Sequence, residues 1–95
     1  MIRIAHRGNT LGSNPTEENH PGYITRAVNQ GFHAEVDVWL FGEEWFLGHD
    51  DPQYPTDESF LENDKLICHA KNEEALHRML KNKNIHCFWH EADFC

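Results

Sequence analysis

The sequence predicts an α/β fold in which parallel strands alternate with helices, with one small hairpin added. Short runs that are almost continuously apolar, as in strands covered on both faces, alternate with stretches whose apolar residues recur at helical spacing. His6, Glu35 and His69, three residues with chemically useful side chains, fall near the ends of predicted strands. Because parallel α/β folds carry their chemistry at the carboxyl ends of strands, function is expected there.

The first part of the chain predicts a strand, a helix and a second strand. Residues 2–6 form a short, mostly apolar run. Pro21 suits the first position of a helix and Gly31 suits its exit, with apolar residues at helical spacing between them. The strand over residues 34–40 would then lie parallel to the first strand, after a right-handed crossover.

The second part predicts a hairpin, a polar connection, and then a strand, a helix and a strand. After a turn, residues 45–48 form a short run that pairs back onto the preceding strand. Residues 51–64 are polar and hold two prolines. Asn72 caps a helix that lies between a strand over residues 65–71 and a strand over residues 85–90.

The composition is acidic and argues against two classes of partner. Of 95 residues, 8 are Lys or Arg and 16 are Asp or Glu, which gives a formal net charge of −8. Nucleic acids and anionic membranes attract basic surfaces, so neither is expected as the main partner. The sequence also lacks an apolar run of about 18 residues, which a membrane span needs, and a signal-peptide pattern.

The cysteines give a prediction about the compartment. Cys68, Cys87 and Cys95 are odd in number and widely spaced. That pattern does not suit a disulfide framework and favours a reducing compartment. We therefore expect a cytoplasmic protein.

Glu35 and Asp37 indicate a metal site. Side chains two residues apart in a strand lie on one face, and two carboxylates there would repel each other and lose hydration unless a cation lay between them. Oxygen ligands favour Mg²⁺ or Ca²⁺. The alternative is a solvent-facing edge strand, but the apolar residues Val36 and Val38 make only one face polar.

Four short motifs carry a family resemblance. His6-Arg7-Gly8, Glu18-Asn19, Glu35-x-Asp37 and His49-Asp50 occur in this order. In order and spacing they resemble the glycerophosphodiester phosphodiesterase family, relatives of phosphatidylinositol-specific phospholipase C. The resemblance implies an eight-stranded (β/α) barrel, which typically needs about 250 residues. Residues 1–95 would then be one partial domain, the N-terminal part of a (β/α)8 barrel.

The resemblance also implies an activity and roles for residues. It implies a metal-dependent hydrolase acting on glycerophosphodiesters or a similar small phosphodiester. His6 and His49 would act as general acid and general base. Arg7 would bind the phosphate through its planar guanidinium, and Lys71 would bind it as a point charge.

One element departs from the family pattern. Where the family usually carries Glu-x-Lys, this chain reads His69-Ala70-Lys71. His69 would replace a carboxylate ligand by an imidazole nitrogen, together with Glu35 and Asp37. Nitrogen ligation makes Mn²⁺ or Zn²⁺ possible beside Mg²⁺ or Ca²⁺.

Two other functions stay open. The chain could be a catalytically silent barrel fragment that binds phosphate or metal or serves in assembly. Alternatively His86, Cys87, His90 and Cys95 could form a soft-metal module, although their spacing matches no closed zinc pattern. Successive strand residues would also turn His86 and Cys87 to opposite faces.

Overall fold

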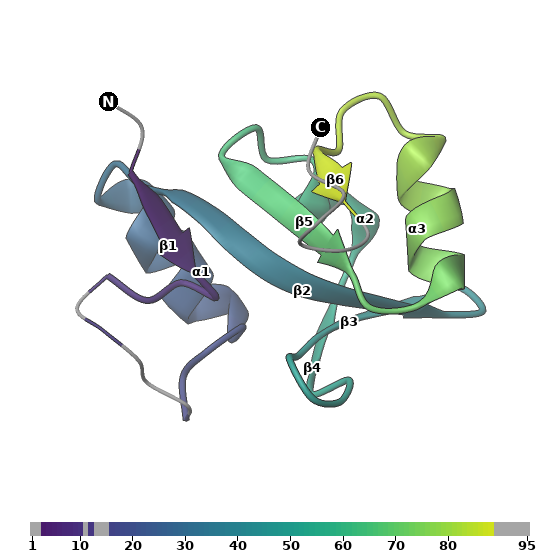
Figure 1. Cartoon of the computed structure of the whole chain (residues 1–95), viewed down its shortest axis with the longest axis horizontal. Coiled ribbons are helices and arrows are strands. Elements are labelled where there is room, and N and C mark those ends of the chain that lie inside the picture. Colours follow the sequence, from purple (N-terminus) through teal and green to yellow (C-terminus); the bar gives the residue numbers. More distant parts are fainter. Residues whose placement is uncertain (1–2, 11, 13–15, 89–95) are drawn as a thin grey trace.

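The computed structural model describes residues 3–10, 12 and 16–88, which form six strands and three helices (Figure 1). The strands are β1 (Ile4–His6), β2 (His33–Phe41), β3 (Glu44–Leu47), β4 (Tyr54–Thr56), β5 (Leu66–Ala70) and β6 (Cys87–Phe88). The helices are α1 (Pro21–Asn29), α2 (Glu58–Leu61) and α3 (Glu73–Leu80).

All six strands belong to one sheet that is organised around β2. The order is β4-β3-β2-β5-β6, and β1 also pairs with β2. The first residues of β2, from His33 to Glu35, pair with β1, and the last, from Val38 to Phe41, pair with β3. Because β5 pairs with β2 along both stretches, β1 and β3 must share the other edge of β2, one after the other.

The prediction that the chain forms the N-terminal part of a (β/α)8 barrel of parallel strands is wrong. The sheet is mixed: β1, β5 and β6 enter it through parallel pairs, whereas β2 with β3 and β3 with β4 are antiparallel. The hairpin of β2 and β3, which only Gly42 and Glu43 separate, was predicted, but β4 extends it to three antiparallel strands at one side of the sheet. A two-residue turn joins antiparallel strands, whereas parallel neighbours need a crossover of about a dozen residues.

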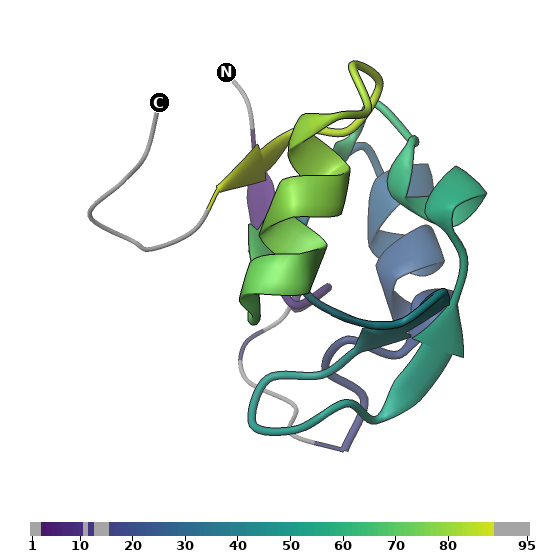
Figure 2. The same ribbon diagram turned by 90° about the vertical axis from the view of Figure 1, so that its right-hand side faces the viewer.

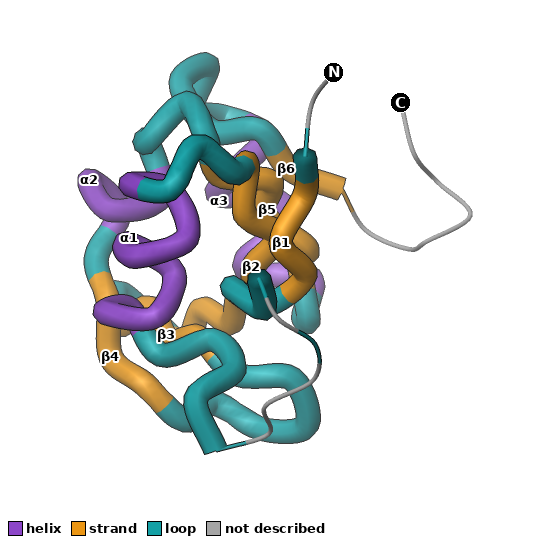
Figure 3. Tube along the Cα trace, turned by 90° about the vertical axis from the view of Figure 1, so that its left-hand side faces the viewer, coloured by secondary structure: helices purple, strands orange, loops and turns teal. Residues whose placement is uncertain are grey.

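The helices cover one face of the sheet. Figures 2 and 3 show the three helices on the same side of β1, β2, β5 and β6. Alternate strand residues point toward them and form one apolar core with Ile24 of α1, Leu61 of α2 and Met79 of α3. The strand residues of this core are Ala34, Val36, Val38, Leu40, Trp45, Leu47, Leu66, Cys68 and Ala70. The intervening residues of β2, Glu35, Asp37 and Trp39, therefore occupy the other face. None of the helices in the described part of the chain is long and apolar enough to cross a membrane.

Asn72 joins the start of α3 to β2. Its Oδ1 accepts from the Ala75 backbone N–H at 3.1 Å as an N-cap, and also from the Leu40 N–H at 3.2 Å. Its Nδ2 donates to the Leu40 carbonyl at 2.9 Å. The side chain thus pairs with β2 just beyond the point where the β5 ladder stops.

Replacing Asn72 by Ala is expected to lower the free energy of unfolding by about 2 kcal/mol, because a cap and the two bonds to Leu40 are lost together. Urea unfolding followed by circular dichroism measures the change. Asn84→Ala, at an exposed position, is the matched control and should change stability by less than about 0.5 kcal/mol. Equal stability of the two variants would contradict the role of Asn72.

Candidate functional site

Asp37 is the centre of the candidate site. Only 2 % of it is exposed, and it lies on the face of β2 away from the helices. Its Oδ1 lies 3.0 Å from Nδ1 of His69, the neighbouring residue on β5. Its Oδ2 accepts from Asn19 Nδ2 at 2.9 Å and lies 3.4 Å from Arg7 Nε. Residues far apart in sequence therefore meet at one buried carboxylate.

Asn19 and Arg7 both reach Asp37 from a left-handed backbone conformation. Their φ angles are 66° and 56°, a region that costs residues other than glycine about 1–3 kcal/mol. Hydrogen bonds hold this geometry: Arg7 N–H donates to the Glu35 carbonyl, and Asn19 N–H donates to the Arg7 carbonyl. Asn19 Oδ1 also accepts from the Asp37 backbone N–H at 2.8 Å, so the buried amide pairs twice with Asp37.

The Arg7 guanidinium lies between two carboxylates. Besides Asp37, its Nη1 donates to Glu18 Oε1 at 3.2 Å. Asn9 Nδ2 donates to Glu18 Oε2 at 2.9 Å, and the Tyr23 hydroxyl donates to Asn9 Oδ1 at 3.0 Å. Glu18 is thereby fixed on both oxygens, and the orientation of Arg7 follows from it.

The Glu35 carboxylate contacts His6, whereas the Asp37 carboxylate contacts Arg7, Asn19 and His69. The two residues are register partners in the β1–β2 pair, and His6 Nδ1 lies 3.3 Å from Glu35 Oε1. The His6 side chain is 69 % exposed, so its ring remains accessible from solvent.

Gly48 ties the turn that carries His49 to the centre of the site. Its N–H donates to the Asp37 carbonyl at 3.0 Å, and its carbonyl accepts from Trp39 Nε1 at 2.7 Å. His49 follows directly, and its Nδ1 lies 2.9 Å from Asp50 Oδ1. The hairpin formed by β2 and β3 thus brings His49 back beside the strand that carries Asp37.

A cavity of about 390 Å³ lies between the loop after β1 and the turn after β3. Arg7, Glu18 and Asn19 line one side of it, and residues 49–51 with Gln53 line the other. The imidazole of His49 and the guanidinium of Arg7 therefore line the same cavity.

Gly48→Ala is expected to cost about 1–3 kcal/mol, because an added methyl would overlap the Asp51 backbone oxygen and lie 3.0 Å from the Gln53 nitrogen. Both neighbours are backbone atoms, so the turn itself must move. Denaturant unfolding measures the loss. Gly22→Ala, where the nearest atoms belong to the His20 side chain, should lose no more than about 0.5 kcal/mol, and a loss as large as that of Gly48→Ala would contradict the explanation.

Asp37 stays ionised although it is buried. Burial by itself would raise the pKa of Asp37. Hydrogen bonds from His69 and Asn19 and the charge of His69 outweigh burial and lower the pKa below its ordinary value. The charge of Lys71, whose backbone N–H donates to the Val38 carbonyl at 2.8 Å, lowers this pKa further. Asp37 is therefore a fixed negative charge in the site.

The predicted metal ligands are not arranged as a ligand set. Glu35 pairs with His6, while both oxygens of Asp37 already contact His69, Asn19 or Arg7. Within the residues that the structure describes, no three His, Cys, Asp or Glu side chains are grouped to hold a metal ion. As placed, the three side chains do not fit a cation, which would have to displace Arg7 or His69 from Asp37, so metal binding stays a prediction.

Most of the predicted site residues lie together on this side of the sheet. Direct contacts join His6 to Glu35, and join Arg7 and His69 to Asp37. His49 shares the cavity with Arg7. Lys71 is linked to the group through its charge on Asp37.

Sequence reasoning assigned no role to Glu18 or Asn19, although both line the cavity and fix Arg7 or Asp37. The Glu18-Asn19 pair was visible as a motif before the first helix. What the sequence did not reveal is that Asn19 is fully buried, where an amide needs polar partners.

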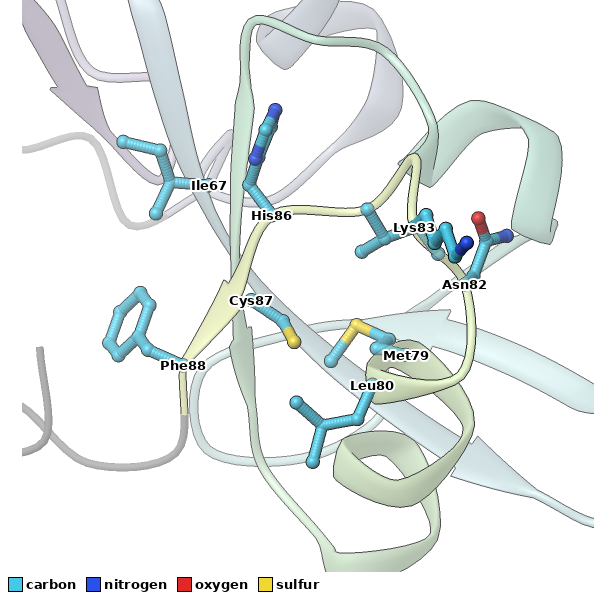
Figure 4. Close-up of a pocket in the computed structure, with 9 residues that line it drawn as sticks. Ile67, Met79, Leu80, Asn82, Lys83, His86, Cys87 and Phe88 are labelled. Carbon is cyan, nitrogen blue, oxygen red and sulfur yellow. The ribbon is translucent and has the colours of Figure 1, made fainter. Parts of the chain in front are cut away.

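The soft-metal alternative rests largely on residues beyond the described ones. His90 and Cys95 lie outside the described residues. The side chains of His86 and Cys87 point in different directions (Figure 4), as the strand alternation predicts.

Comparisons with protein-family models, with curated proteins and with solved structures give no match. The family resemblance therefore stays a prediction.

Proposed function

We propose that the protein hydrolyses a glycerophosphodiester or a similar small phosphodiester, with His6 and His49 as general acid and base. The observation that supports this most is that each of these imidazoles has a carboxylate near Nδ1. In addition, Arg7 directly follows His6 in the chain and lines the same cavity as His49. Hydrolysis would leave an alcohol and a phosphomonoester.

The carboxylates determine which ring nitrogen can act. An ionised carboxylate only accepts hydrogen bonds, so the hydrogen bond to Asp50 favours the tautomer of His49 with a proton on Nδ1. Glu35, 3.3 Å from Nδ1 of His6, would favour the same tautomer of His6 once the two approach to hydrogen-bond distance. Nε2 of each ring is then the nitrogen that takes or gives a proton. In the proposed reaction one imidazole takes a proton from the attacking water while the other donates a proton to the leaving alcohol oxygen.

Arg7 would hold the phosphate. Its Nε and Nη1 contact Asp37 and Glu18, and Nη2 makes no hydrogen bond to a carboxylate among the described residues. A phosphate oxygen could bind at Nη2 through a charge-assisted hydrogen bond. Lys71 would add a second positive charge nearby. The carboxylates of Asp37 and Glu18 keep the guanidinium in place. Because they are negative, they favour a phosphodiester, which carries one negative charge, over a phosphomonoester, which carries up to two.

An assay with a panel of phosphodiesters tests the proposal. Glycerophosphodiesters with different alcohols are incubated with the full chain in EDTA and, separately, in Mg²⁺, Ca²⁺, Mn²⁺ or Zn²⁺, and the release of phosphomonoester is measured. Turnover of at least one diester is expected, and its metal dependence tests the predicted cation. Binding of diesters without turnover in any of these conditions would favour the silent, binding-only function.

A matched pair of arginine variants ties the activity to the site. Arg7→Gln is expected to lower kcat/KM about 10- to 100-fold, because a charge-assisted hydrogen bond to phosphate is worth about 1.5–3 kcal/mol. Arg26→Gln on the exposed side of α1 should leave it unchanged. Equal effects of the two substitutions would contradict a phosphate role for Arg7.

A further inference from the structure

Cys68 and Cys87 are direct neighbours across two parallel strands. They are register partners in the pairing of β5 with β6, and the Cys68 N–H donates to the carbonyl of His86, the residue before Cys87. Paired strands lie about 4.8 Å apart, within the range of about 4.4–6.8 Å between the Cα atoms of disulfide-bonded cysteines. Both thiols are reduced in the structure.

The two side chains point to the same face of the sheet. Cys68 belongs to the apolar core under α3, and Cys87 packs against that core. On the opposite face the next residues, His69 and Phe88, stack with ring centroids 4.7 Å apart and planes 2° from parallel. The stacked rings hold the two strands together on one face, while Cys68 and Cys87 lie side by side on the other.

Only one of the two thiols can be reached from solvent. Cys68 is completely buried, whereas Cys87 is partly exposed. Cys87 lines a cavity of about 420 Å³ between β6 and α3, and its sulfur points toward Met79 in this cavity (Figure 4). A small disulfide reagent could therefore reach Cys87 first.

We propose that Cys68 and Cys87 are a redox modification site that forms a reversible intramolecular disulfide with a low-molecular-weight disulfide such as oxidised glutathione as the oxidant. The Cys87 thiolate attacks one glutathione sulfur, breaks the glutathione S–S bond and releases one glutathione thiolate. Burial, and to a lesser extent the charge of Cys87, raises the pKa of the Cys68 thiol well above its ordinary value. Cys68 therefore gives its proton to the departing second glutathione thiolate as its sulfur attacks the Cys87 sulfur, which forms the Cys68–Cys87 bond and breaks the mixed disulfide. The protein loses two electrons and two protons, and one oxidised glutathione becomes two reduced molecules. This inference does not depend on the proposed hydrolase activity.

The surrounding structure favours a bond that is easily reversed. The pairing of β5 with β6 and the stacking of His69 on Phe88 on the other face resist a large movement of β6 toward β5. A disulfide formed under such restraint stores strain and is reduced more readily.

The test uses the full chain with Cys95→Ser, which removes the third thiol. The folded protein is equilibrated in glutathione buffers of increasing oxidised fraction, quenched with acid, alkylated and analysed by mass spectrometry. The expected result is the loss of two hydrogens per chain and a cross-linked peptide pair that contains Cys68 and Cys87. Dithiothreitol should restore the reduced mass.

Two further variants make the outcome decisive. Adding Cys87→Ser should abolish the loss of two hydrogens, while adding Cys68→Ala should leave a stable mixed disulfide of Cys87 with glutathione. Because Cys68 lies in the core, the Cys87→Ser variant carries the test if Cys68→Ala fails to fold. A protein that stays folded by circular dichroism but keeps both thiols at the most oxidising ratio, or that stops at the mixed disulfide, would overturn the proposal.

Discussion

Replacing Asp37 by Ala is expected to lower the free energy of unfolding by about 3 kcal/mol. The substitution leaves the guanidinium of Arg7 without one of its two carboxylates and the buried amide of Asn19 without an acceptor. Removing one member of a buried charged group costs about 3–5 kcal/mol, and the partial exposure of Arg7 places the expectation at the lower end. Denaturant unfolding at neutral pH measures the loss.

The same residue should give the protein a specific acid sensitivity. The pKa of Asp37 is lower in the folded chain than its ordinary value of 3.8, so the carboxylate contributes stability above that pH. This contribution falls away as the pH drops through 3.8 toward the lower folded pKa. Asp37→Asn should lose this part of the pH dependence because it has no proton to bind.

The matched control for Asp37 is Asp50→Ala, since the Asp50 side chain is 93 % exposed. It should change the stability by less than about 0.5 kcal/mol. If Asp37→Ala is as stable as Asp50→Ala, or if Asp37→Asn retains the whole acid transition of the unmodified chain, Asp37 is not the organising residue of the site.

Replacing His49 by Ala is expected to lower kcat for phosphodiester hydrolysis by about 10² to 10⁴, the usual effect of losing a positioned acid or base. The imidazole is only partly buried, so the fold should survive: its side chain is 42 % exposed, and Gly48 rather than His49 anchors the turn. Steady-state kinetics and a thermal melt of the same preparation separate the two effects.

His77→Ala, on an exposed position of α3, is the control for His49→Ala and should keep full activity. An unchanged kcat in His49→Ala, with the melt also unchanged, would remove His49 from the reaction. A reduced kcat accompanied by an equally reduced melting temperature would instead indicate a structural role.

The positions of most strands and helices followed from local patterns, whereas β4 did not. Pro21 begins α1 and Asn72 caps α3, as their positions predict. Strand β4 holds Pro55 within a polar stretch, a composition that is typical of loops. Proline is tolerated there because β4 is at the edge of the sheet, where the missing N–H costs no ladder bond.

The architecture could not be predicted from the same patterns, because they do not state how strands pair. The hairpin itself was predicted, and the short turn at Gly42, with a φ of 64°, sends β3 back along β2 as expected. The polar stretch after it was expected to be a connection, but it supplies β4, which pairs with β3 in the antiparallel sense. The hairpin is thereby extended to three antiparallel strands at this side of the sheet, which the patterns did not show.

The candidate site shows the same limit of local reasoning. The spacing of Glu35 and Asp37 places both on one face of β2, as predicted, but two residues along a strand are still about 7 Å apart. Each carboxylate has its own partners: His6 for Glu35, and Arg7 with His69 for Asp37. The sequence contains these partners, but their pairing depends on the β1–β2 and β2–β5 registers.

The most direct test of the proposed function is a phosphorus NMR time course of a glycerophosphodiester with the full chain, His6→Ala and His49→Ala, each in the metal condition that gives the most turnover. The account predicts that the diester resonance converts to a monoester resonance with the unmodified chain and that each substitution slows the conversion at least about 10²-fold. No conversion by the unmodified, folded chain, or equal conversion by all three proteins, would contradict it.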